Sequence, residues 1–317
     1  MVPALSTVLI TGAGGYIGGR LAATLVRGGS AVRGFSRDPA PWLGIPETIG
    51  DLCTASAQEI AAACAGCDAV VHLAGQDEIV AAREPERALG GTVLAAQRLA
   101  AACRTAGVPR LVYLSTVHVY GARMAPEAVL DETLRAEPRS AYAISRLACE
   151  HALAAALGVD TTLVVLRLTN SVGAPANVGV DRWSLVTNDL ARQGAREGRL
   201  TLHSHGAQWR DFVALGDACA VIAAACGSGA LAPGTYNLAS GVPRTVRELA
   251  GLVQDAFAAR TGRRPPLDAP PAPADAPAPY RVAPDRLAAA GLAPGIDLGP
   301  AVAETVDFCL ANRDHLG

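Results

Sequence analysis

The sequence predicts an α/β fold built on a doubly wound parallel sheet, with a smaller C-terminal lobe. Short apolar runs alternate with helical stretches throughout the first 166 residues, as they do in chains whose parallel strands are joined by crossover helices. A glycine-rich loop also joins the first apolar run to the first helical stretch. With half of its residues hydrophobic, the 317-residue chain can bury a large core.

The expected elements follow one another in a regular order. Strands are predicted at 7–10, 31–35, 69–73, 110–114, 161–166 and 234–238, with a further strand before Gly50, and helices at 16–28, 86–106, 139–157, 185–193, 245–260, 285–291 and 300–312. The segment 265–284 is rich in proline and alanine. We expect it to be an ordered, extended surface segment, and a disordered linker is the alternative.

Charge and cysteine content exclude several functions. The chain contains 27 arginines, no lysine and 29 acidic residues, which gives a net charge of −2. We therefore expect neither nucleic acid nor an anionic membrane as a partner. The N-terminus lacks a signal-peptide pattern, no apolar run approaches a membrane span, and the eight cysteines lie in apolar surroundings, so we expect a cytoplasmic protein. Cys64 and Cys67 lack a second ligand pair, and His203 and His205 lack a third ligand, so we predict no metal site.

The loop Thr11-Gly-Ala-Gly-Gly-Tyr-Ile-Gly18 predicts a dinucleotide site. Gly12 permits a tight turn, Gly15 lets the backbone approach a pyrophosphate, and Gly18 allows the helix to pack closely on the strand. The helix that Tyr16 and Ile17 open offers free N–H groups to the phosphates. We therefore expect a Rossmann-like dinucleotide-binding domain at 1–166 and mainly a substrate-binding lobe at 167–317, with 234–240 returning to the sheet.

The residues after the second and third strands bear on the choice of dinucleotide. Ser36 and Arg37 stand where NAD-binding domains usually carry an acid, and a hydroxyl with a guanidinium suits a 2′-phosphate. We therefore predict NADP as the cofactor. NAD is the alternative, because Asp38 follows one residue later. Asp51 and Leu52 are expected beside the adenine ring.

Tyr142 and Arg146 form the candidate proton-transfer pair. They are four residues apart on a predicted helix and so share one face. Lowering the pKa of a tyrosine from about 10 towards neutrality requires roughly 4 kcal/mol. A cation about 4 Å away supplies about that much at an effective dielectric constant of about 20. Arginine is longer and planar and cannot release a proton, and a packed tyrosine beside a surface arginine is the alternative.

A hydroxyl partner for Tyr142 is expected at the end of strand 110–114. Ligands bind at the carboxyl ends of strands in such sheets. Thr116 is the first choice to bond a substrate oxygen, and Ser115 is the second.

The chain resembles the extended short-chain dehydrogenase/reductase family, in the branch that acts on nucleotide-activated sugars. The resemblance covers nearly all of the chain and rests on strings in a matching order and spacing. These are the glycine loop, Gly50-Asp-Leu52, His72-Leu-Ala-Gly75, Leu114-Ser-Thr-Val-His-Val-Tyr-Gly121, Tyr142-x-x-x-Arg146, Leu166-Arg-Leu-Thr-Asn-Ser-Val-Gly173 with Pro175, Arg210-Asp-Phe-Val213, Tyr236-Asn-Leu-Ala-Ser-Gly241 and Thr245-Val-Arg-Glu-Leu249.

The resemblance implies a role for individual residues. Tyr142 matches the family's acid/base and Thr116 its partner, Arg146 occupies the family's lysine position, and Ala88 stands where members often carry asparagine. The remaining assignments concern the two ligands and the assembly. Leu73, Ala74 and Gly75 are expected against the cofactor, and Asn170 and Arg210 against a nucleotide sugar. Trp183 and Asn188 lie in the segment expected to line the nucleotide pocket. Helices 86–106 and 139–157 are expected to form a homodimer interface. Trp183 either stacks on a base or anchors the small lobe.

The leading hypothesis for function is an NADPH-dependent reductase of a nucleotide-linked keto sugar. An NAD-dependent epimerase is the alternative. A dehydratase is less favoured because Val117 and His118, rather than acids, follow Thr116. A catalytically degenerate dinucleotide-binding sensor or scaffold would explain Arg146 and Ala88, and the fold also accommodates non-sugar ketones.

Overall fold

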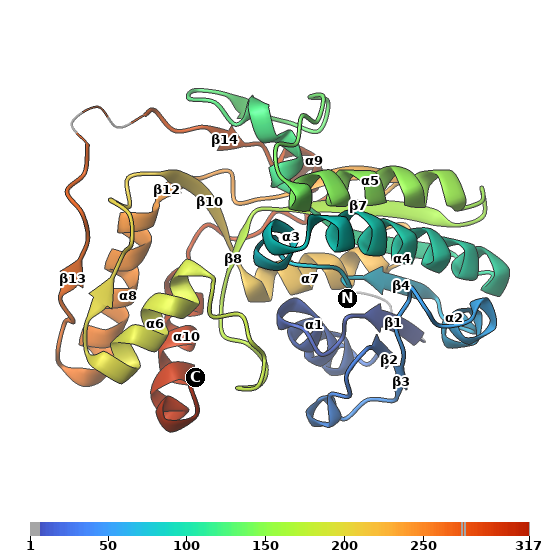
Figure 1. Ribbon diagram of the computed structural model, residues 1–317, viewed down its shortest axis with the longest axis horizontal. Helices are drawn as coiled ribbons and strands as arrows, with labels where there is room; N and C mark the ends of the chain where they lie inside the picture. Colours follow the sequence, from blue (N-terminus) through green and yellow to red (C-terminus); the bar gives the residue numbers. More distant parts are fainter. Residues whose placement is uncertain (1–6, 274, 276, 317) are drawn as a thin grey trace.

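A seven-stranded sheet forms the centre of the larger part of the molecule (Figure 1). The computed structural model describes residues 7–273, 275 and 277–316. The spatial order of the strands is β11 (Gly234–Leu238), β7 (Thr162–Leu168), β5 (Arg110–Thr116), β4 (Ala69–His72), β1 (Thr7–Thr11), β2 (Ala31–Ser36) and β3 (Glu47–Ile49). Every pairing in this sheet is parallel.

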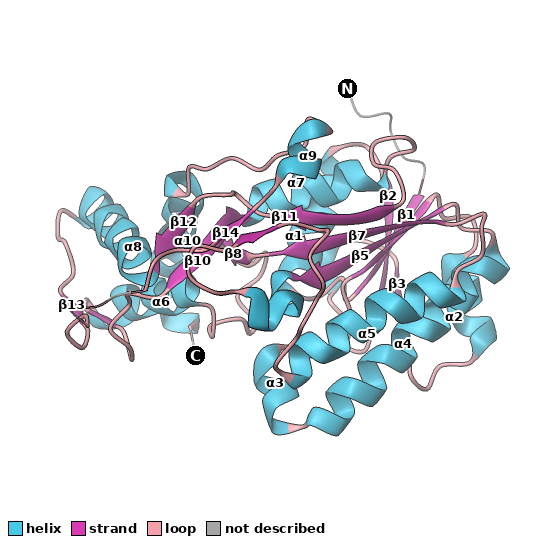
Figure 2. Ribbon diagram, turned by 90° about the horizontal axis from the view of Figure 1, so that it is seen from above, coloured by secondary structure: helices cyan, strands magenta, loops and turns pink. Residues whose placement is uncertain are grey.

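Helices cover both faces of the sheet because the strands are apolar on both faces. Along β1, Val8 and Ile10 belong to one hydrophobic core and Leu9 to the other. The first core includes α1 (Tyr16–Arg27) and α7 (Leu215–Cys226), and the second includes α2 (Ala57–Cys64), α4 (Pro85–Ala106) and α5 (Ala141–Ala156). Figure 2 shows the two layers on opposite sides of the strands. The predicted doubly wound α/β fold is confirmed.

Short-range signals set the ends of the helices that position the site. Gly107 ends α4 in a left-handed conformation with φ of 67°, which glycine adopts without a steric penalty. The Ser140 hydroxyl begins α5 by accepting a hydrogen bond from the Ala143 N–H at 3.2 Å. Tyr142 therefore lies in the first turn of α5.

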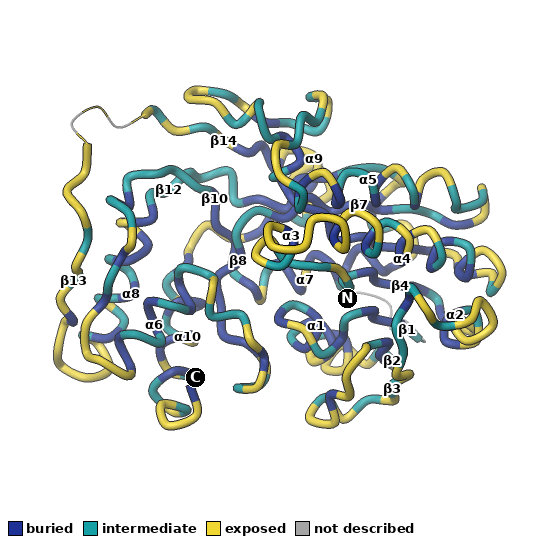
Figure 3. Tube along the Cα trace, viewed as in Figure 1, coloured by how far each residue is buried: buried dark blue, intermediate teal, exposed yellow. Residues whose placement is uncertain are grey.

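The smaller lobe has its own core, made by three helices and short strands. The helices are α6 (Val186–Glu197), α8 (Val246–Thr261) and α10 (Gly299–Ala311), followed by a short turn at Arg313–His315. The strands are β8 (Asn170–Val172), β10 (Trp209–Ala214) and β12 (Pro243–Thr245) in one sheet, and β9 (Leu200–Thr201) with β13 (Leu267–Asp268) in another. Figure 3 shows the buried positions following the central strands and the inner sides of these helices.

Segments from the C-terminal half return to the large lobe. Strand β11 pairs with β7, and α7 packs against α1. The described part of 265–284 is extended, and β14 (Arg281–Val282) pairs with β6 (Val129–Leu130) before α9 (Asp285–Ala289). Residues 274 and 276 of this segment lie outside the described part. The sequence-based domain boundary at residue 166 stays a prediction.

Three helices were not predicted from the sequence: α2, α7 and the short α3 (Glu78–Arg83). Helix α7 reads Leu-Gly-Asp-Ala-Cys-Ala-Val-Ile-Ala-Ala-Ala-Cys, and most of it is buried between α1 and the sheet. A helix that is apolar on nearly all sides has no alternation of polar and apolar residues to reveal it. In the part of the chain that the structure describes, no helix is both long and apolar enough to span a membrane.

A buried network of an ion pair and hydrogen bonds joins β5, α5 and β7 beneath the carboxyl end of the sheet. Arg167 on β7 donates from Nη2 to Glu150 Oε2 at 2.7 Å and from Nε to Glu150 Oε1 at 3.1 Å. The Ser115 hydroxyl donates to Glu150 Oε1 at 2.5 Å, and the Arg167 guanidinium lies 5.0 Å from the centre of the Tyr120 ring. These side chains fix the end of β5 against the middle of α5.

Replacing Arg167 should destabilise the protein strongly. Arg167→Met leaves the Glu150 carboxylate buried without its cation, and we expect a loss of about 3–5 kcal/mol in the free energy of unfolding. The double variant Arg167→Met/Glu150→Met should recover most of that loss, because it removes both charges. Denaturant unfolding followed by circular dichroism measures both. Equal stability of the single variant and the parent would contradict this account of the buried pair.

Candidate active site

A cavity of about 1100 Å³ opens at the carboxyl ends of the central strands. Its walls come from the glycine loop, the ends of β2, β4 and β5, the first turn of α5, and the segment between β8 and α6. Ligands bind at this edge in open α/β sheets. The cavity contains most of the residues that the sequence analysis selected.

The glycine loop has the shape of a phosphate cradle. Gly12 adopts φ of 75°, and a Cβ there would lie 3.0 Å from the Ala74 nitrogen. A Cβ on Gly18 would lie 2.7 Å from the Ala13 oxygen, so any side chain would push α1 off the loop. The Gly15 N–H donates to the Gly12 carbonyl oxygen at 3.1 Å and closes the turn. No side chain caps the N-terminus of α1, and its first turn holds no acid, so the N–H groups at Tyr16 and Ile17 remain available to an anion.

The far end of the cavity combines a guanidinium with a free hydroxyl. Arg37 is exposed and lines the cavity, and the buried Ser36 hydroxyl has no hydrogen-bond partner within the described residues. Asp38 lines the same region. Asp51 accepts a hydrogen bond from the Cys53 N–H at 2.8 Å, and Leu52 is buried against the core while also reaching the cavity. These residues fit the adenosine half of a dinucleotide.

Thr116, Tyr142 and Arg146 line the opposite end of the cavity. The Thr116 oxygen accepts a hydrogen bond from the His118 N–H at 3.3 Å. Ser115 also lines the cavity, but its proton is directed to Glu150. Thr116 is therefore better placed than Ser115 to donate a proton to a ligand.

Arg146 is buried beside Tyr142. Its guanidinium carbon lies 5.1 Å from the centre of the Tyr142 ring, and Nη2 donates to the Gln76 carbonyl oxygen at 3.1 Å. A Cβ on Gly75 would come within 2.9 Å of Nη1, so glycine makes room for the guanidinium there. No carboxylate in the described part of the chain pairs with Arg146. Burial acts to lower the pKa of Arg146, but the phenols of Tyr142 and Tyr113 raise it overall, so the side chain stays charged.

A neutral histidine supports this end of the cavity from below. The His72 Nδ1 atom lies 2.8 Å from the Thr11 hydroxyl oxygen, and the ring stacks on Tyr113 at 5.5 Å. Burial, aided by the charge of Arg146, lowers the pKa of His72 to about 3. His72 thus connects the glycine loop with Leu73 and Ala74, which line the cavity.

The residues predicted to bind substrate do not all meet in this cavity. Asn170 lines it while donating its amide to the Asp211 carbonyl oxygen at 2.9 Å. Asn188 is fully buried and holds the Arg182 carbonyl oxygen at 3.2 Å. Trp183 lines a separate hollow of about 370 Å³.

Arg210 does not line the large cavity within the described residues. Its Nη1 donates to the Trp209 carbonyl oxygen at 2.9 Å. Asp211 points elsewhere, because successive side chains of a strand face opposite sides, and its carboxylate accepts hydrogen bonds from Thr169, Ser240 and Gly241. The predicted contact between Arg210 and a diphosphate stays a prediction.

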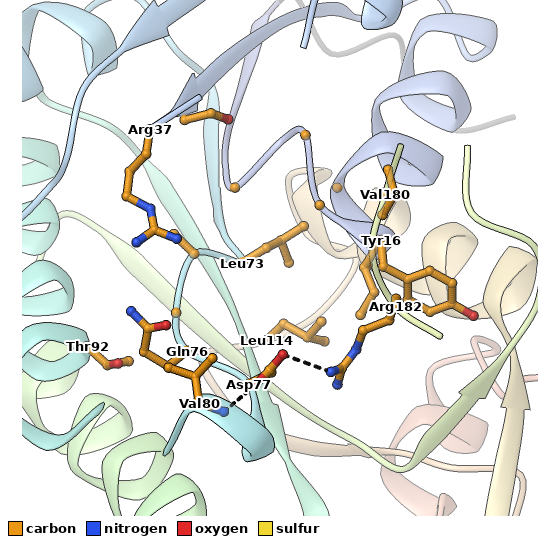
Figure 4. A pocket seen from close by; sticks show the side chains of 18 of the residues that line it. Tyr16, Arg37, Leu73, Gln76, Asp77, Val80, Thr92, Leu114, Val180 and Arg182 are labelled. Carbon is orange, nitrogen blue, oxygen red and sulfur yellow. Dashed lines mark hydrogen bonds and ion pairs between the residues drawn. The ribbon is translucent and has the colours of Figure 1, made fainter. Parts of the chain in front are cut away.

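The structure adds residues that the sequence analysis did not assign to the site. His118 lines the cavity with its ring 6.5 Å from that of Tyr142 in an edge-on arrangement. Burial and the nearby charge of Arg210 lower the pKa of His118, while Glu78 opposes them, so the ring is neutral at pH 7. Its position two residues after Thr116 was the available signal. Gln76, Asp77, Glu78, Thr92 and Arg182 also line the cavity, and Figure 4 shows most of them.

Comparison with known proteins identifies the family. The model of the NAD dependent epimerase/dehydratase family matches residues 8–239. The chain belongs to this family. It is therefore an NAD(P)-dependent enzyme of the short-chain dehydrogenase/reductase type, and the resemblance seen in the sequence is confirmed.

Two curated relatives are both reductases. The chain is 31% identical to a 2-alkyl-3-oxoalkanoate reductase of Stenotrophomonas maltophilia strain K279a, over 76% of this chain and 73% of the relative. It is 30% identical to a GDP-6-deoxy-D-mannose reductase of Pseudomonas aeruginosa, over 78% of this chain and 79% of the relative.

Two solved structures share the fold across nearly the whole chain. MoeE5 in complex with UDP-glucuronic acid and NAD is 26% identical, with a TM-score of 0.81 and coverage of 97% of this chain and 100% of its own. RMD from Pseudomonas aeruginosa complexed with NADPH is 25% identical, with a TM-score of 0.78 and coverage of 97% and 99%. These structural neighbours bind NAD in one case and NADPH in the other.

A side chain on Gly18 should abolish dinucleotide binding. Gly18→Ala places a methyl group against the Gly12 and Ala13 carbonyl oxygens, and we expect a loss of about 1–3 kcal/mol of stability together with the loss of NADPH binding. Gly251→Ala on α8 is the matched control, because a Cβ there meets nothing within 4 Å. Fluorescence titration and thermal unfolding compare the two. If Gly18→Ala bound NADPH as tightly as the parent protein, the assignment of the glycine loop as the phosphate-binding cradle would be refuted.

Proposed function

We propose that the protein is an NADPH-dependent reductase of a keto group on a nucleotide-linked sugar, with Tyr142 as the acid. The observation that carries this proposal is the placement of Tyr142 and Thr116 in the same cavity as the glycine loop and Arg37. A bound NADPH supplies the hydride for the carbonyl carbon. The protein then has to hold the carbonyl oxygen and deliver one proton to it.

The residues at the end of β5 and the start of α5 perform those two tasks. The Thr116 hydroxyl and the Tyr142 phenol hydrogen-bond the substrate oxygen, and Tyr142 transfers its proton as negative charge develops there. The Arg146 guanidinium stabilises the phenolate that remains. The guanidinium carbon lies 5.1 Å from the centre of the Tyr142 ring. A cation at about that distance from an anion contributes about 3 kcal/mol at an effective dielectric constant of about 20. This supports arginine as an electrostatic replacement for lysine.

The choice of NADPH over NADH rests on Arg37 and Ser36. The exposed guanidinium and the unpartnered hydroxyl offer charge-assisted and neutral hydrogen bonds to a 2′-phosphate. The Pseudomonas aeruginosa RMD with bound NADPH supports this choice, and MoeE5 with bound NAD supports the alternative. An epimerase would use NAD and re-reduce the same carbon.

A reductase of a non-sugar 3-oxo acid is the second candidate. The Stenotrophomonas maltophilia relative is a 2-alkyl-3-oxoalkanoate reductase. Arg210 and Trp183, which would recognise a nucleotide sugar, lie outside the large cavity in the described residues. The same hydride and proton transfers would serve this substrate.

We propose a homodimer in which α4 and α5 of one subunit meet those of the other. Leu89 and Leu94 on α4 and Ile144 on α5 are large apolar side chains that remain exposed in the single chain. Analytical ultracentrifugation tests the assembly.

Removing the Tyr142 hydroxyl should stop turnover without stopping cofactor binding. We expect Tyr142→Phe to lower kcat by about 100-fold or more, with the NADPH Kd changed less than about threefold. NADPH oxidation is assayed with nucleotide-linked 4-keto sugars and with 3-oxo acids. The class of substrate that supports NADPH oxidation separates the two candidate functions.

Tyr236→Phe is the matched control, since its hydroxyl bonds the Ala232 carbonyl oxygen away from the cavity. Full activity of Tyr142→Phe would refute the assigned acid. If the parent protein bound a dinucleotide but turned over neither class of substrate, the sensor or scaffold hypothesis would be favoured.

Arg37 should determine the preference for the phosphorylated dinucleotide. Because a lost hydrogen bond to a charged group costs about 1.5–3 kcal/mol, we expect Arg37→Ala to weaken NADPH binding about 10- to 100-fold and to leave NADH binding unchanged. Arg33→Ala on β2, the strand that precedes Arg37, is the control, because Arg33 bonds the Ala65 carbonyl oxygen outside the cavity. Any dinucleotide retained through purification is identified first. Retained NAD, or equal affinities in the parent, would replace this proposal with the epimerase.

A further inference from the structure

The segment between β8 and α6 forms one wall of the dinucleotide cavity. Asn177, Val180 and Arg182 are among its residues that line the cavity. Near its start, the Tyr16 phenol of α1 donates to the Gly173 carbonyl oxygen at 2.7 Å. Near its end, Asn188 of α6 holds the Arg182 carbonyl oxygen. We call residues 173–185 the cavity strap.

One side chain of the strap reaches the opposite wall. Arg182 donates from Nη1 to Asp77 Oδ2 at 3.2 Å and from Nη2 to Glu78 Oε2 at 2.8 Å. Asp77 and Glu78 begin α3, which belongs to the large lobe and lies more than 100 positions away in sequence. Figure 4 shows Arg182 extended from the strap to Asp77.

The acceptors are held in place for this contact. Asp77 Oδ1 accepts a hydrogen bond from the Val80 N–H at 2.8 Å and so caps α3, which leaves Oδ2 directed at Arg182. Glu78 is the first residue of α3. On the strap side, Ser184 accepts a further hydrogen bond from Arg182 Nη1 at 3.3 Å. Three groups from two lobes therefore hold one guanidinium.

The cavity location gives these ion pairs a role beyond stability. Asp77, Glu78 and Arg182 all line the cavity that also holds the glycine loop and Tyr142. A dinucleotide that extends from Arg37 to Arg146 would lie beside the strap and the start of α3, because all four line the same cavity. We propose that Arg182, through Asp77 and Glu78, fastens the cavity strap over the bound dinucleotide and sets the rate at which the dinucleotide leaves.

The expected size of the effect follows from exposure. The Arg182 side chain is 21% exposed, and those of Asp77 and Glu78 are 36% and 47% exposed. Ion pairs this exposed are weak singly and are screened by salt. Loss of both should raise the dissociation rate constant about three- to tenfold. Raising the ionic strength should have the same effect on the parent protein.

The test is a stopped-flow measurement of dinucleotide release. Protein loaded with NADPH, and in parallel with NADH, is mixed with excess NADP⁺ or NAD⁺, and the decay of nicotinamide fluorescence gives the dissociation rate constant. We expect Arg182→Gln and Glu78→Gln each to raise it and Arg182→Lys to restore part of the difference. Arg182→Gln/Glu78→Gln should resemble Arg182→Gln alone, because the two side chains act as one contact. Asp77→Asn keeps the helix cap and should have a smaller effect.

Arg260→Gln is the matched control. Arg260 also joins two elements by an ion pair, with Asp307 of α10, and its side chain is 27% exposed, but it does not line the cavity. We expect parental release rates in this variant and similar melting temperatures in all variants. Release from Arg182→Gln within twofold of the parent, equal acceleration by Arg260→Gln, or independent addition of the Arg182 and Glu78 effects would each overturn the proposal.

This inference depends on the proposed function only for the position of the dinucleotide in the cavity. The measurement needs no substrate and no turnover, and either dinucleotide serves as the probe. A protein that prefers NADH, or that reduces no sugar, would refute the proposed function while leaving the role of Arg182 testable. Binding of neither dinucleotide would overturn both.

Discussion

The site depends on how the chain accommodates one buried cation. Arg146 is 8% exposed and, within the described residues, has no carboxylate partner. Its charge is stabilised by the Gln76 carbonyl oxygen and by the ring of Tyr142. Gly75 supplies the space, since any side chain there would meet the guanidinium. An unpaired buried charge is costly in a core. The proposed effect of Arg146 on the pKa of Tyr142 would explain why this charge is retained.

Helix α5 connects this cation with the rest of the large lobe. Tyr142 and Arg146 occupy its first turns, and Glu150 lies one turn further along the same helix. The Glu150 carboxylate is held by Arg167 and in turn accepts the Ser115 proton. The end of β5 and the start of α5 are therefore positioned by the same buried group. Because Ser115 is engaged there, the choice between the two neighbouring hydroxyls falls on Thr116.

The sequence was sufficient for the features that depend on local pattern. The glycine loop, the succession of strands and helices along the chain, and the spacing of Tyr142 and Arg146 follow from turn chemistry and periodicity. It was not sufficient for α7, whose apolar residues face the sheet and α1 and leave no polar stripe. It also could not bring Arg182 to Asp77 and Glu78, because no local rule relates residues over 100 positions apart. The positions of Arg210 and Trp183 outside the large cavity likewise depend on strand and segment geometry that the motifs do not encode.

The fastening of the strap bears on the kind of reaction the cavity suits. A reductase must exchange its dinucleotide in every cycle, whereas an epimerase regenerates its own and gains from retaining it. Tight retention would require contacts too strong to open on the timescale of turnover. The ion pairs of Arg182 are half exposed at their acidic ends, and pairs of that kind open readily. A cavity closed by weak, reversible contacts is better matched to exchange than to permanent retention, and this agrees with the phosphate-binding role proposed for Ser36 and Arg37 at its other end.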